Sequence, residues 1–404
     1  MTTLRWAGLG FAVVGLLRGG LNSVWAEDGQ EFLTDALNLP WYEPFATPFN
    51  GYFHTVARTC FAFIALFPVS WAAALNASVA AVLTALLAVA VTAAARDRLG
   101  TPAALVIGAT AAVPMGYVPN TLAQLQFPLV YAGLWMLLWT PPRPSARVAA
   151  VVVPALAVLN SILGLLLVPV ALLRLARHRD RDALLRVLVL LPGAALQLVP
   201  LLLGGSRRDV GERPVLNPVD VAHMYLRWGV PRSFLGEAWL TQPATQSATQ
   251  PDRLLTLLGL AVPAAIVAVA LLRLTRPRWR LAALLAGFAA GAGAFQLAVH
   301  GSPEGRYLVL ITLPNIAAAV ALALPGDSLR GTVPFVALAT LLAAVNIANL
   351  RPGGYTDGLP RWDTTVAAAR AQCQAEPRLL RVTVHTAQWP VLGWEAVLPC
   401  DRLR

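Results

Sequence analysis

The sequence predicts an all-α membrane protein with about 11 transmembrane helices (10–12). Of its 404 residues, 57% are hydrophobic and only 13% are charged, whereas soluble domains carry about 25% charged residues. Apolar segments recur along the chain with lengths near the roughly 20 residues that a helix needs to cross a bilayer. Arginines lie at the ends of these segments, where basic residues act as topology signals. These observations together favour a polytopic helical bundle.

About eleven segments have the composition of a membrane span. They cover residues 4–24, 70–95, 101–118, 121–140, 146–159, 163–177, 183–203, 253–273, 280–299, 306–324 and 331–349. The segments at 146–159 and 163–177 are short, and Pro154, Gly164 and Pro169 predict broken or tilted helices there. Residues 53–67 form a further apolar helix that ends at Pro68, which we interpret as an interfacial or re-entrant piece.

The arginine positions predict the orientation of the bundle. With a cytoplasmic N-terminus, the connections at 96–98, 143–147, 174–179, 276–280 and 327–330 all fall inside, in agreement with the positive-inside rule. The connections 25–69, 117–120, 204–252 and 300–306 then fall outside, as does the tail. We therefore expect a multi-pass plasma-membrane protein with an extracytoplasmic C-terminus. Its parts are a transmembrane bundle (1–349), with outer loops 25–69 and 204–252, and a small outer appendage (350–404).

The outer loop 204–252 and the tail have polar patterns of their own. Val219 to Trp239 mixes apolar and charged residues, which is typical of an amphipathic helix at the membrane interface. In the tail, Thr364 to Cys373 predicts a short helix, and Arg381 to His385 alternates like a strand. We therefore expect a small extracytoplasmic α+β appendage of about 50 residues, too small to be stable without the bundle or a crosslink.

The three cysteines indicate a crosslink, and the sequence offers no metal motif. Cys373 and Cys400 flank the only long polar region. A disulfide between them would stabilise an extracytoplasmic tail by roughly 3 to 4 kcal/mol. No C-x-x-C pair or histidine-rich spacing supports a divalent metal site.

The basic composition does not indicate nucleic acid binding. All 31 basic residues are arginine, and they lie at the ends of apolar segments. A nucleic-acid surface would instead show a basic stripe with interleaved aromatics. We expect membrane lipid, and no nucleic acid, as a partner.

An acidic island follows the first apolar segment. No arginine occurs between Arg18 and Arg58, yet five carboxylates fall there, namely Glu27, Asp28, Glu31, Asp35 and Glu43. Carboxylates near lipid are costly to maintain and are by default functional hypotheses. The plainer alternative is that Glu27-Asp28-Gly29 stops the first helix and marks the water boundary.

The predicted topology gathers further polar groups on the same outer side. They are His54 and Arg58; Asn120, Gln124 and Gln126; Asn160 and Ser161; and His300, Glu304, Arg306 and Tyr307. A carboxylate can act as general base toward a sugar hydroxyl, and arginine can hold a phosphate bidentately, so the set suits chemistry on a phosphate-bearing lipid. The same groups could serve a transporter. Alternatively, the amides could hydrogen-bond between helices, the arginines could snorkel to headgroups, and the histidine could simply be packed.

The order of these features resembles a known superfamily. A first membrane helix, an acidic pair in the first outer loop, an interfacial helix, a many-pass bundle and a small outer C-terminal appendage resemble the type-C glycosyltransferases, which use polyprenyl-phosphate sugars. More closely, the chain is similar to a group of actinobacterial membrane proteins related to that superfamily. The short patches that carry this similarity are Trp25-Ala-Glu-Asp-Gly29, Pro48 to His54 with Arg58, the Asn120 and Gln124 turn, Gly305-Arg-Tyr307, and Trp394 to Cys400.

The resemblance implies roles for the outer polar groups. Asp28 or Glu27 would be the general base, with His54 beside them as a catalytic candidate, and Arg306, with Arg58 and Tyr307, would hold the donor phosphate. Asn120, Gln124, His300 and Glu304 would line the substrate site.

The implied partners follow from these roles. A lipid-linked sugar would be the donor, with no nucleotide sugar or other cofactor, and an envelope glycan, lipid or protein would be the acceptor. Two alternatives remain: a transporter or flippase of an envelope lipid or glycan, and a non-catalytic envelope assembly factor. A transporter would show pseudo-symmetric halves with broken helices meeting at mid-membrane, and the sequence shows no such repeat.

Overall fold

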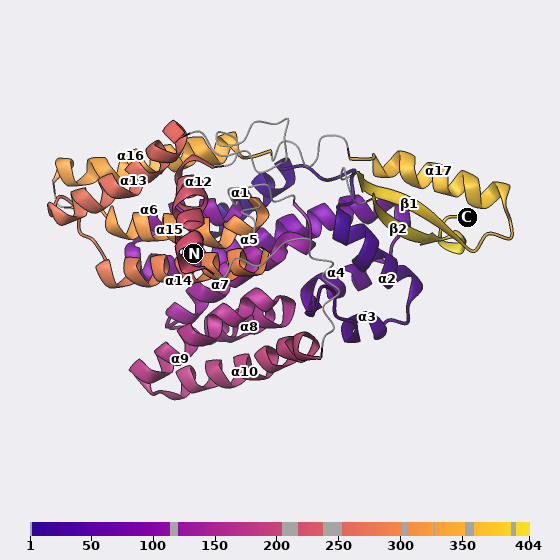
Figure 1. Cartoon of the computed structure of the whole chain (residues 1–404), viewed down its shortest axis with the longest axis horizontal. Coiled ribbons are helices and arrows are strands. Elements are labelled where there is room, and N and C mark those ends of the chain that lie inside the picture. Colours follow the sequence, from indigo (N-terminus) through magenta and orange to yellow (C-terminus); the bar gives the residue numbers. More distant parts are fainter. Residues whose placement is uncertain are drawn as a thin grey trace.

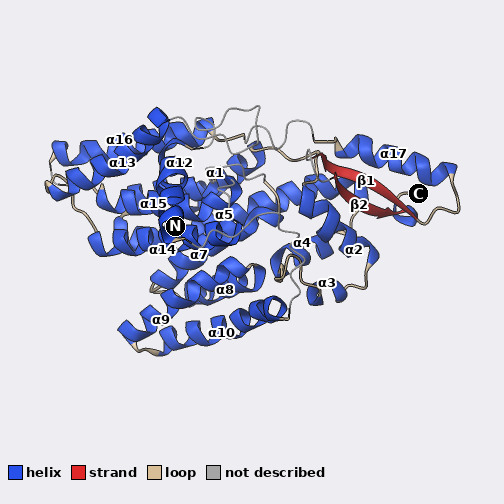
Figure 2. Ribbon diagram, in the orientation of Figure 1, coloured by secondary structure: helices blue, strands red, loops and turns tan. Residues whose placement is uncertain are grey.

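The protein is a helical bundle that carries a small two-stranded sheet at one end (Figures 1 and 2). The computed structural model describes residues 2–113, 120–203, 217–236, 253–300, 305–326, 328–351, 359–388 and 393–404. Glu304 and most of the outer loop 204–252 lie outside these residues. The side chain of His300, at the end of a helix, is also not described.

The helices follow one another with short connections. They are α1 (Thr2–Leu17), α2 (Thr34–Asn38), α3 (Glu43–Ala46), α4 (Thr55–Ile64), α5 (Ala72–Leu99), α6 (Thr101–Ala112), α7 (Gln126–Leu138), α8 (Pro144–Asn160), α9 (Leu167–His178), α10 (Arg181–Leu202), α11 (Pro218–Met224), α12 (Val230–Leu235), α13 (Arg253–Leu271), α14 (Trp279–His300), α15 (Val309–Leu322), α16 (Leu329–Ala348) and α17 (Trp362–Ala375). The strands are β1 (Arg381–Gln388) and β2 (Gly393–Pro399). Three tighter or wider turns matter below: the π-helix η1 (Asp28–Leu33) and the 3₁₀ turns η3 (Ala123–Leu125) and η6 (Gly305–Leu308).

Each predicted span contains a helix, but most of these helices are shorter than a bilayer crossing. In the described part of the chain, four helices are long and apolar enough to cross a membrane, at Val69–Leu99, Arg181–Pro200, Arg253–Leu271 and Leu329–Ala348. Six further apolar helices have 10–17 residues. The number of about 11 full spans is therefore not confirmed, and the inside–outside orientation stays a prediction.

The first helix shows why a predicted span can be too long. The apolar pattern predicted a helix over 4–24, whereas α1 ends at Leu17. Gly19 and Gly20 follow with φ angles of +90° and +89°. Glycine enters this left-handed region without steric cost, so the chain turns out of the helix there. The prediction was wrong at this boundary because two glycines interrupt an otherwise apolar run.

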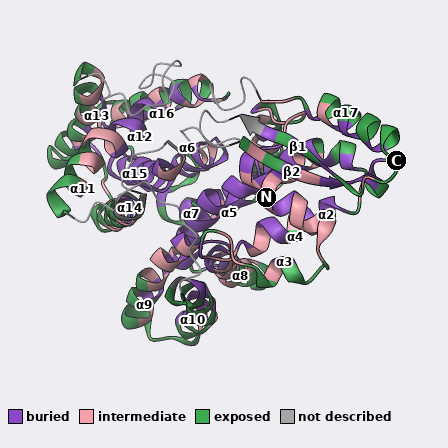
Figure 3. Cartoon of the chain, turned by 45° about the vertical axis from the view of Figure 1, so that its right-hand side comes forward, coloured by how far each residue is buried: buried purple, intermediate pink, exposed green. Residues whose placement is uncertain are grey.

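Helix α15 forms the centre of the bundle. Every one of its residues from Val309 to Leu322 is buried, and α14, α7, α6, α12 and α13 pack around it. A helix that is apolar on all sides belongs in such a position. The outer helices α9, α10, α13 and α16 instead expose leucines and valines (Figure 3). These exposed apolar faces are what lipid contact requires.

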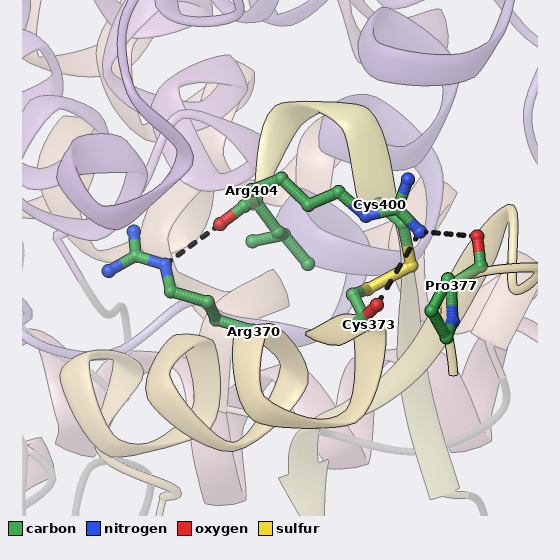
Figure 4. The surroundings of a disulfide bond; sticks show 6 residues. Arg370, Cys373, Pro377, Cys400 and Arg404 are labelled. Atoms are coloured by element: carbon green, nitrogen blue, oxygen red, sulfur yellow. Dashed lines mark hydrogen bonds between the residues drawn. A yellow bond between two sulfur atoms is a disulfide. The ribbon is translucent and has the colours of Figure 1, made fainter. Parts of the chain in front are cut away.

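The C-terminal appendage consists of α17 and a hairpin. Strands β1 and β2 pair antiparallel, with an irregularity between His385 and Ala387. The sequence predicted α17 and part of β1 but not β2. A disulfide joins Cys373 at the end of α17 to Cys400 after β2, and the Arg404 side chain donates to the Pro377 carbonyl beside it at 2.8 Å (Figure 4).

The appendage is attached to the bundle by buried contacts. Trp362 is 2% exposed, and its indole Nε1 donates to the carbonyl of Val69 at 2.8 Å. The Trp362 backbone N–H donates to Asn22 just after α1. The appendage therefore packs against the beginning of α5 and the connection that follows α1, which is the connection that carries the acidic island.

Candidate functional site

The acidic island lies on a nearly continuous helix. Residues 26–38 form a short α-helical start, the π-helix η1 and then α2. Glu27, Glu31 and Asp35 are four residues apart, so they occupy neighbouring positions along the helix. The charges of Glu27 and Asp35 both act on Glu31. A π-helical turn inside a helix is frequent at functional sites, and here it accompanies a stripe of three carboxylates.

The beginning of this stripe contacts a distant arginine. Arg306 lies on η6, immediately before the central helix α15, and its Nη1 donates to Glu27 Oε1 at 3.0 Å. The two side chains are 21% and 13% exposed, so the pair is mostly but not completely shielded from water. The structure thus brings together Glu27 and Arg306, two predicted site residues that are 279 positions apart.

Tyr307 orients the arginine. The Arg306 Nη2 lies 3.0 Å from the Tyr307 hydroxyl, and the guanidinium carbon lies 4.9 Å from the centre of the tyrosine ring. The ring also meets Phe127 of α7 edge-on at 6.3 Å. A guanidinium on an aromatic face is held by cation–π attraction, so Arg306 is presented in a defined orientation.

Asp28 points in a different direction from Glu27. It is completely buried, and its Oδ1 accepts the backbone N–H of Ala123 on η3 at 2.9 Å. Burial raises the pKa of Asp28 to about 7, and the charge of Glu27 adds to this effect, while the contacts with Ala123, Thr121 and Asn76 oppose it. Asp28 therefore ties the acidic helix to the beginning of α7 and is not open to a substrate.

The far end of the stripe holds a second ion pair. Arg58 on α4 donates from Nη1 to Asp35 Oδ2 at 2.7 Å, and its guanidinium carbon lies 5.6 Å from the centre of the Phe32 ring. Its side chain is only 2% exposed. Arg58 was predicted to hold the donor phosphate, but the structure places it inside the protein against Asp35. Its position matches a structural anchor of α4 better than a ligand site.

Glu31 lies between the two ion pairs and is half-buried. Burial raises its pKa, and the neighbouring charge of Asp35 adds to this effect, while Arg58 and a contact with Gln30 oppose it. The sequence analysis assigned Glu31 and Asp35 to the acidic island but gave them no role. The four-residue spacing from Glu27 was the signal that could have identified them.

His54 lies in an aromatic environment. Its ring centre lies 4.4 Å from that of Tyr52, 5.3 Å from that of Phe32 and 5.8 Å from that of Phe49. Neither ring nitrogen has a hydrogen-bond partner among the described residues. Burial lowers the pKa of His54 to about 3, and the Arg58 charge adds to this effect. This neutral, packed ring has no described contact that would support the predicted catalytic role.

The predicted substrate-lining amides hold helices together. Asn120 donates to the Ala77 carbonyl at 2.9 Å, and Gln126 accepts the Ser161 hydroxyl at 2.8 Å. Gln124 is buried on η3, and its side-chain oxygen has no hydrogen-bond partner among the described residues. His300 and Glu304 cannot be placed relative to this site, because the side chain of the first and all of the second lie outside the described part of the chain.

The appendage supports the acidic helix from the other side. The Val397 N–H of β2 donates to Thr34 Oγ1 at 3.0 Å, and Asn38 donates to the Val397 carbonyl at 2.8 Å. Gly29 faces Thr386, and a Cβ built on Gly29 would lie 2.5 Å from Thr386 Cγ2. The appendage therefore fixes the position of the helix that carries Glu27. Among the described residues, no group of three His, Cys, Asp or Glu side chains is arranged to hold a metal ion.

Comparisons with known proteins give one distant likeness. No family model matches the chain, and no curated protein matches its sequence. The fold is similar to that of an oligosaccharyltransferase from Archaeoglobus fulgidus, whose crystal structure carries a tethered acceptor peptide, with 13% identity and a TM-score of 0.44. The match covers 93% of this chain and 57% of the archaeal one, so the chain spans little more than half of that protein. A likeness at this level does not assign an activity.

Proposed function

We propose that this protein is a membrane glycosyltransferase that transfers a sugar from a polyprenyl-phosphate donor to an acceptor of the cell envelope at the outer face. The observation that carries this proposal is the contact between Glu27 and Arg306. It joins a carboxylate, which can accept a hydroxyl proton, to a guanidinium, which can hold a phosphate. The two groups lie on the side of the bundle where the arginine pattern predicts the outer membrane surface.

In the proposed mechanism, the ion pair is the resting state of the site. The donor phosphate carries the same kind of oxygen acceptor as the Glu27 carboxylate, so it would replace Glu27 on Arg306. Tyr307 would keep the guanidinium in place during this exchange. Glu27 would then be ionised, freed from its partner and adjacent to the bound phosphate. The exchange would thus make the base available only when a donor is present.

The transfer is a displacement at the anomeric carbon. The Glu27 carboxylate takes the proton from the acceptor hydroxyl, and the acceptor oxygen forms a bond to the anomeric carbon. The bond between that carbon and the phosphate oxygen breaks, and its electron pair leaves with the polyprenyl phosphate. Arg306 stabilises the charge that develops on this leaving group. The reaction needs no nucleotide and no redox partner.

Asp28 would act as a positioning residue in this scheme. Its hydrogen bond to the Ala123 N–H fixes η1 against the beginning of α7. Because its side chain is completely buried, an acceptor hydroxyl cannot reach it without movement of the helix. We therefore assign the base to Glu27 and not to Asp28.

Transfer assays on membranes test this assignment. We expect Glu27→Gln and Arg306→Gln each to reduce sugar transfer from polyprenyl-phosphate donors by at least about a hundredfold, the usual contribution of a general base or a charge clamp. Asp35→Asn is the matched control, because it removes an ion pair from the same acidic helix without touching Arg306. Full activity of Glu27→Gln, or an equal loss in Asp35→Asn, would contradict the assignment of the base.

A further inference from the structure

A second polar site lies at the other end of the bundle. A cavity of about 690 Å³ is formed there by the last turns of α5, α7 and α9 and the beginning of α14. The beginning of α5 contacts the appendage through Trp362, whereas Arg98 in its last turn lines the cavity. A helix of this length rises about 1.5 Å per residue. The cavity is therefore roughly 40 Å from the Glu27–Arg306 pair and independent of the proposed transfer reaction.

The cavity carries a strong excess of positive charge. Its lining includes one aspartate, Asp97, and five arginines, which are Arg98, Arg174, Arg177, Arg278 and Arg280. Asp97 is already engaged, because its Oδ2 accepts the indole N–H of Trp139 at 2.7 Å. Several like charges around one cavity repel each other unless an anion lies between them. The lining therefore favours an anionic ligand.

The arginines divide into two that are held and three that are available. Arg98 donates to the Leu138 carbonyl, and Arg174 donates to the Leu137 carbonyl at 2.9 Å and pairs with Asp182 at 3.2 Å. These bonds hold two positive charges in the wall.

The other three arginines come from two helix ends that face the cavity. They are Arg177 in the last turn of α9, and Arg278 and Arg280 at the beginning of α14. Their side chains are exposed, and within the described part of the chain they make no hydrogen bond or ion pair. They can therefore close on a ligand phosphate.

The remaining walls are apolar. Leu173, Leu281 and Leu284 line the cavity together with Val170 and Trp279. Leu173 belongs to the exposed apolar surface of α9. A free phosphate ion gains nothing from such walls, whereas a phospholipid places its phosphate among arginines and its acyl chains against leucines. Basic pockets between membrane helices bind anionic lipid headgroups in this way.

We propose that this cavity binds an anionic phospholipid, with the headgroup phosphate held by Arg177, Arg278 and Arg280 and the acyl chains lying against α9 and α14. By the arginine pattern this end of the bundle faces the cytoplasmic leaflet. The lipid would connect α9 to α14, two helices that are distant in the sequence. The site recognises a phosphate ester with an apolar tail.

Lipid binding to the detergent-solubilised full-length chain tests the proposal. Native mass spectrometry with phosphatidylglycerol, phosphatidylcholine and inorganic phosphate as separate probes would measure adduct formation. We expect phosphatidylglycerol to bind the wild-type chain at least about tenfold more tightly than phosphatidylcholine. The triple variant Arg177→Gln, Arg278→Gln and Arg280→Gln should bind phosphatidylglycerol at least about tenfold more weakly, because each arginine near an anionic lipid contributes roughly a fivefold factor.

A second triple variant provides the control for net charge. Arg143→Gln, Arg181→Gln and Arg330→Gln remove the same charge from exposed positions at the beginnings of α8, α10 and α16, outside the cavity. This variant should bind phosphatidylglycerol within about twofold of wild type. An equal loss of affinity in both triple variants would overturn the proposal, because it would indicate diffuse surface charge in place of a site.

The apolar wall distinguishes a lipid from free phosphate. Leu173→Asn should weaken phosphatidylglycerol binding and leave all five arginines in place. Inorganic phosphate at tens of millimolar should not displace phosphatidylglycerol from the wild-type chain. Displacement by phosphate, together with unchanged binding to Leu173→Asn, would refute a lipid ligand. Should the triple variant fail to fold, the single variants Arg177→Gln and Arg280→Gln carry the same test, each with an expected loss of roughly fivefold.

Discussion

The exchange of partners on Arg306 predicts that Glu27→Gln separates donor binding from transfer. In the resting protein the carboxylate of Glu27 competes with the donor phosphate for one guanidinium. A hydrogen bond to a charged group contributes about 1.5–3 kcal/mol, and about 1.4 kcal/mol corresponds to a tenfold change in affinity. Glu27→Gln should therefore bind polyprenyl phosphate roughly tenfold more tightly than wild type, while transfer falls by at least about a hundredfold.

Equilibrium binding of radiolabelled polyprenyl phosphate to the detergent-purified chain would measure the affinity, and single-turnover transfer would measure the chemistry. Arg306→Gln should lose both, because it removes the group that holds the phosphate. Asp35→Asn should change neither by more than about twofold, since surface-independent sites act additively. Weaker donor binding by Glu27→Gln would refute the reasoning, because it would show that Glu27 supports the donor site structurally and does not compete for Arg306.

Three further predictions concern the frame of the site. The pKa of Asp28, raised to about 7 by burial, implies that folding becomes less favourable by about 4 kcal/mol as the pH rises from about 4 to 8, since the native state holds a proton that the unfolded state releases; Asp28→Asn should remove this dependence in thermal unfolding scans. Gly29→Ala should lower transfer by displacing η1 from Thr386, and unchanged activity would contradict the close contact. Removing the disulfide by Cys373→Ser or Cys400→Ser should destabilise the appendage by roughly 3 to 4 kcal/mol, seen as faster proteolysis of the tail under non-reducing conditions; equal proteolysis would contradict it.

The sequence predicted the positions of the helices well and their ends less well. Apolar composition identified α5, α10, α13 and α16, because burial and lipid contact both select for it. It placed the end of α1 near residue 24, although Gly19 and Gly20 stop the helix at Leu17. It also missed β2, because the apolar residues that bury one face of a short hairpin strand do not alternate clearly here.

Contacts between distant residues were the part of the site that the sequence could not provide. Glu27 and Arg306 were both candidates, but their contact depends on where the central helix α15 begins relative to η1. The partner of Arg58 was equally open. It was predicted to hold a phosphate, whereas the four-residue spacing of the carboxylates places Asp35 where Arg58 reaches it inside the protein. Packing decides such pairings, and local pattern does not.

Release of polyprenyl phosphate by the wild-type chain tests the central claim most directly. The purified full-length protein would be reconstituted in liposomes with an envelope extract as acceptor and a panel of radiolabelled polyprenyl-phosphate sugars, including mannose, glucose and arabinose. We expect at least one donor to be consumed, with sugar appearing on the acceptor and free polyprenyl phosphate in equal amount. Binding of these donors without any consumption above protein-free liposomes would contradict a transferase and favour a transport or assembly role.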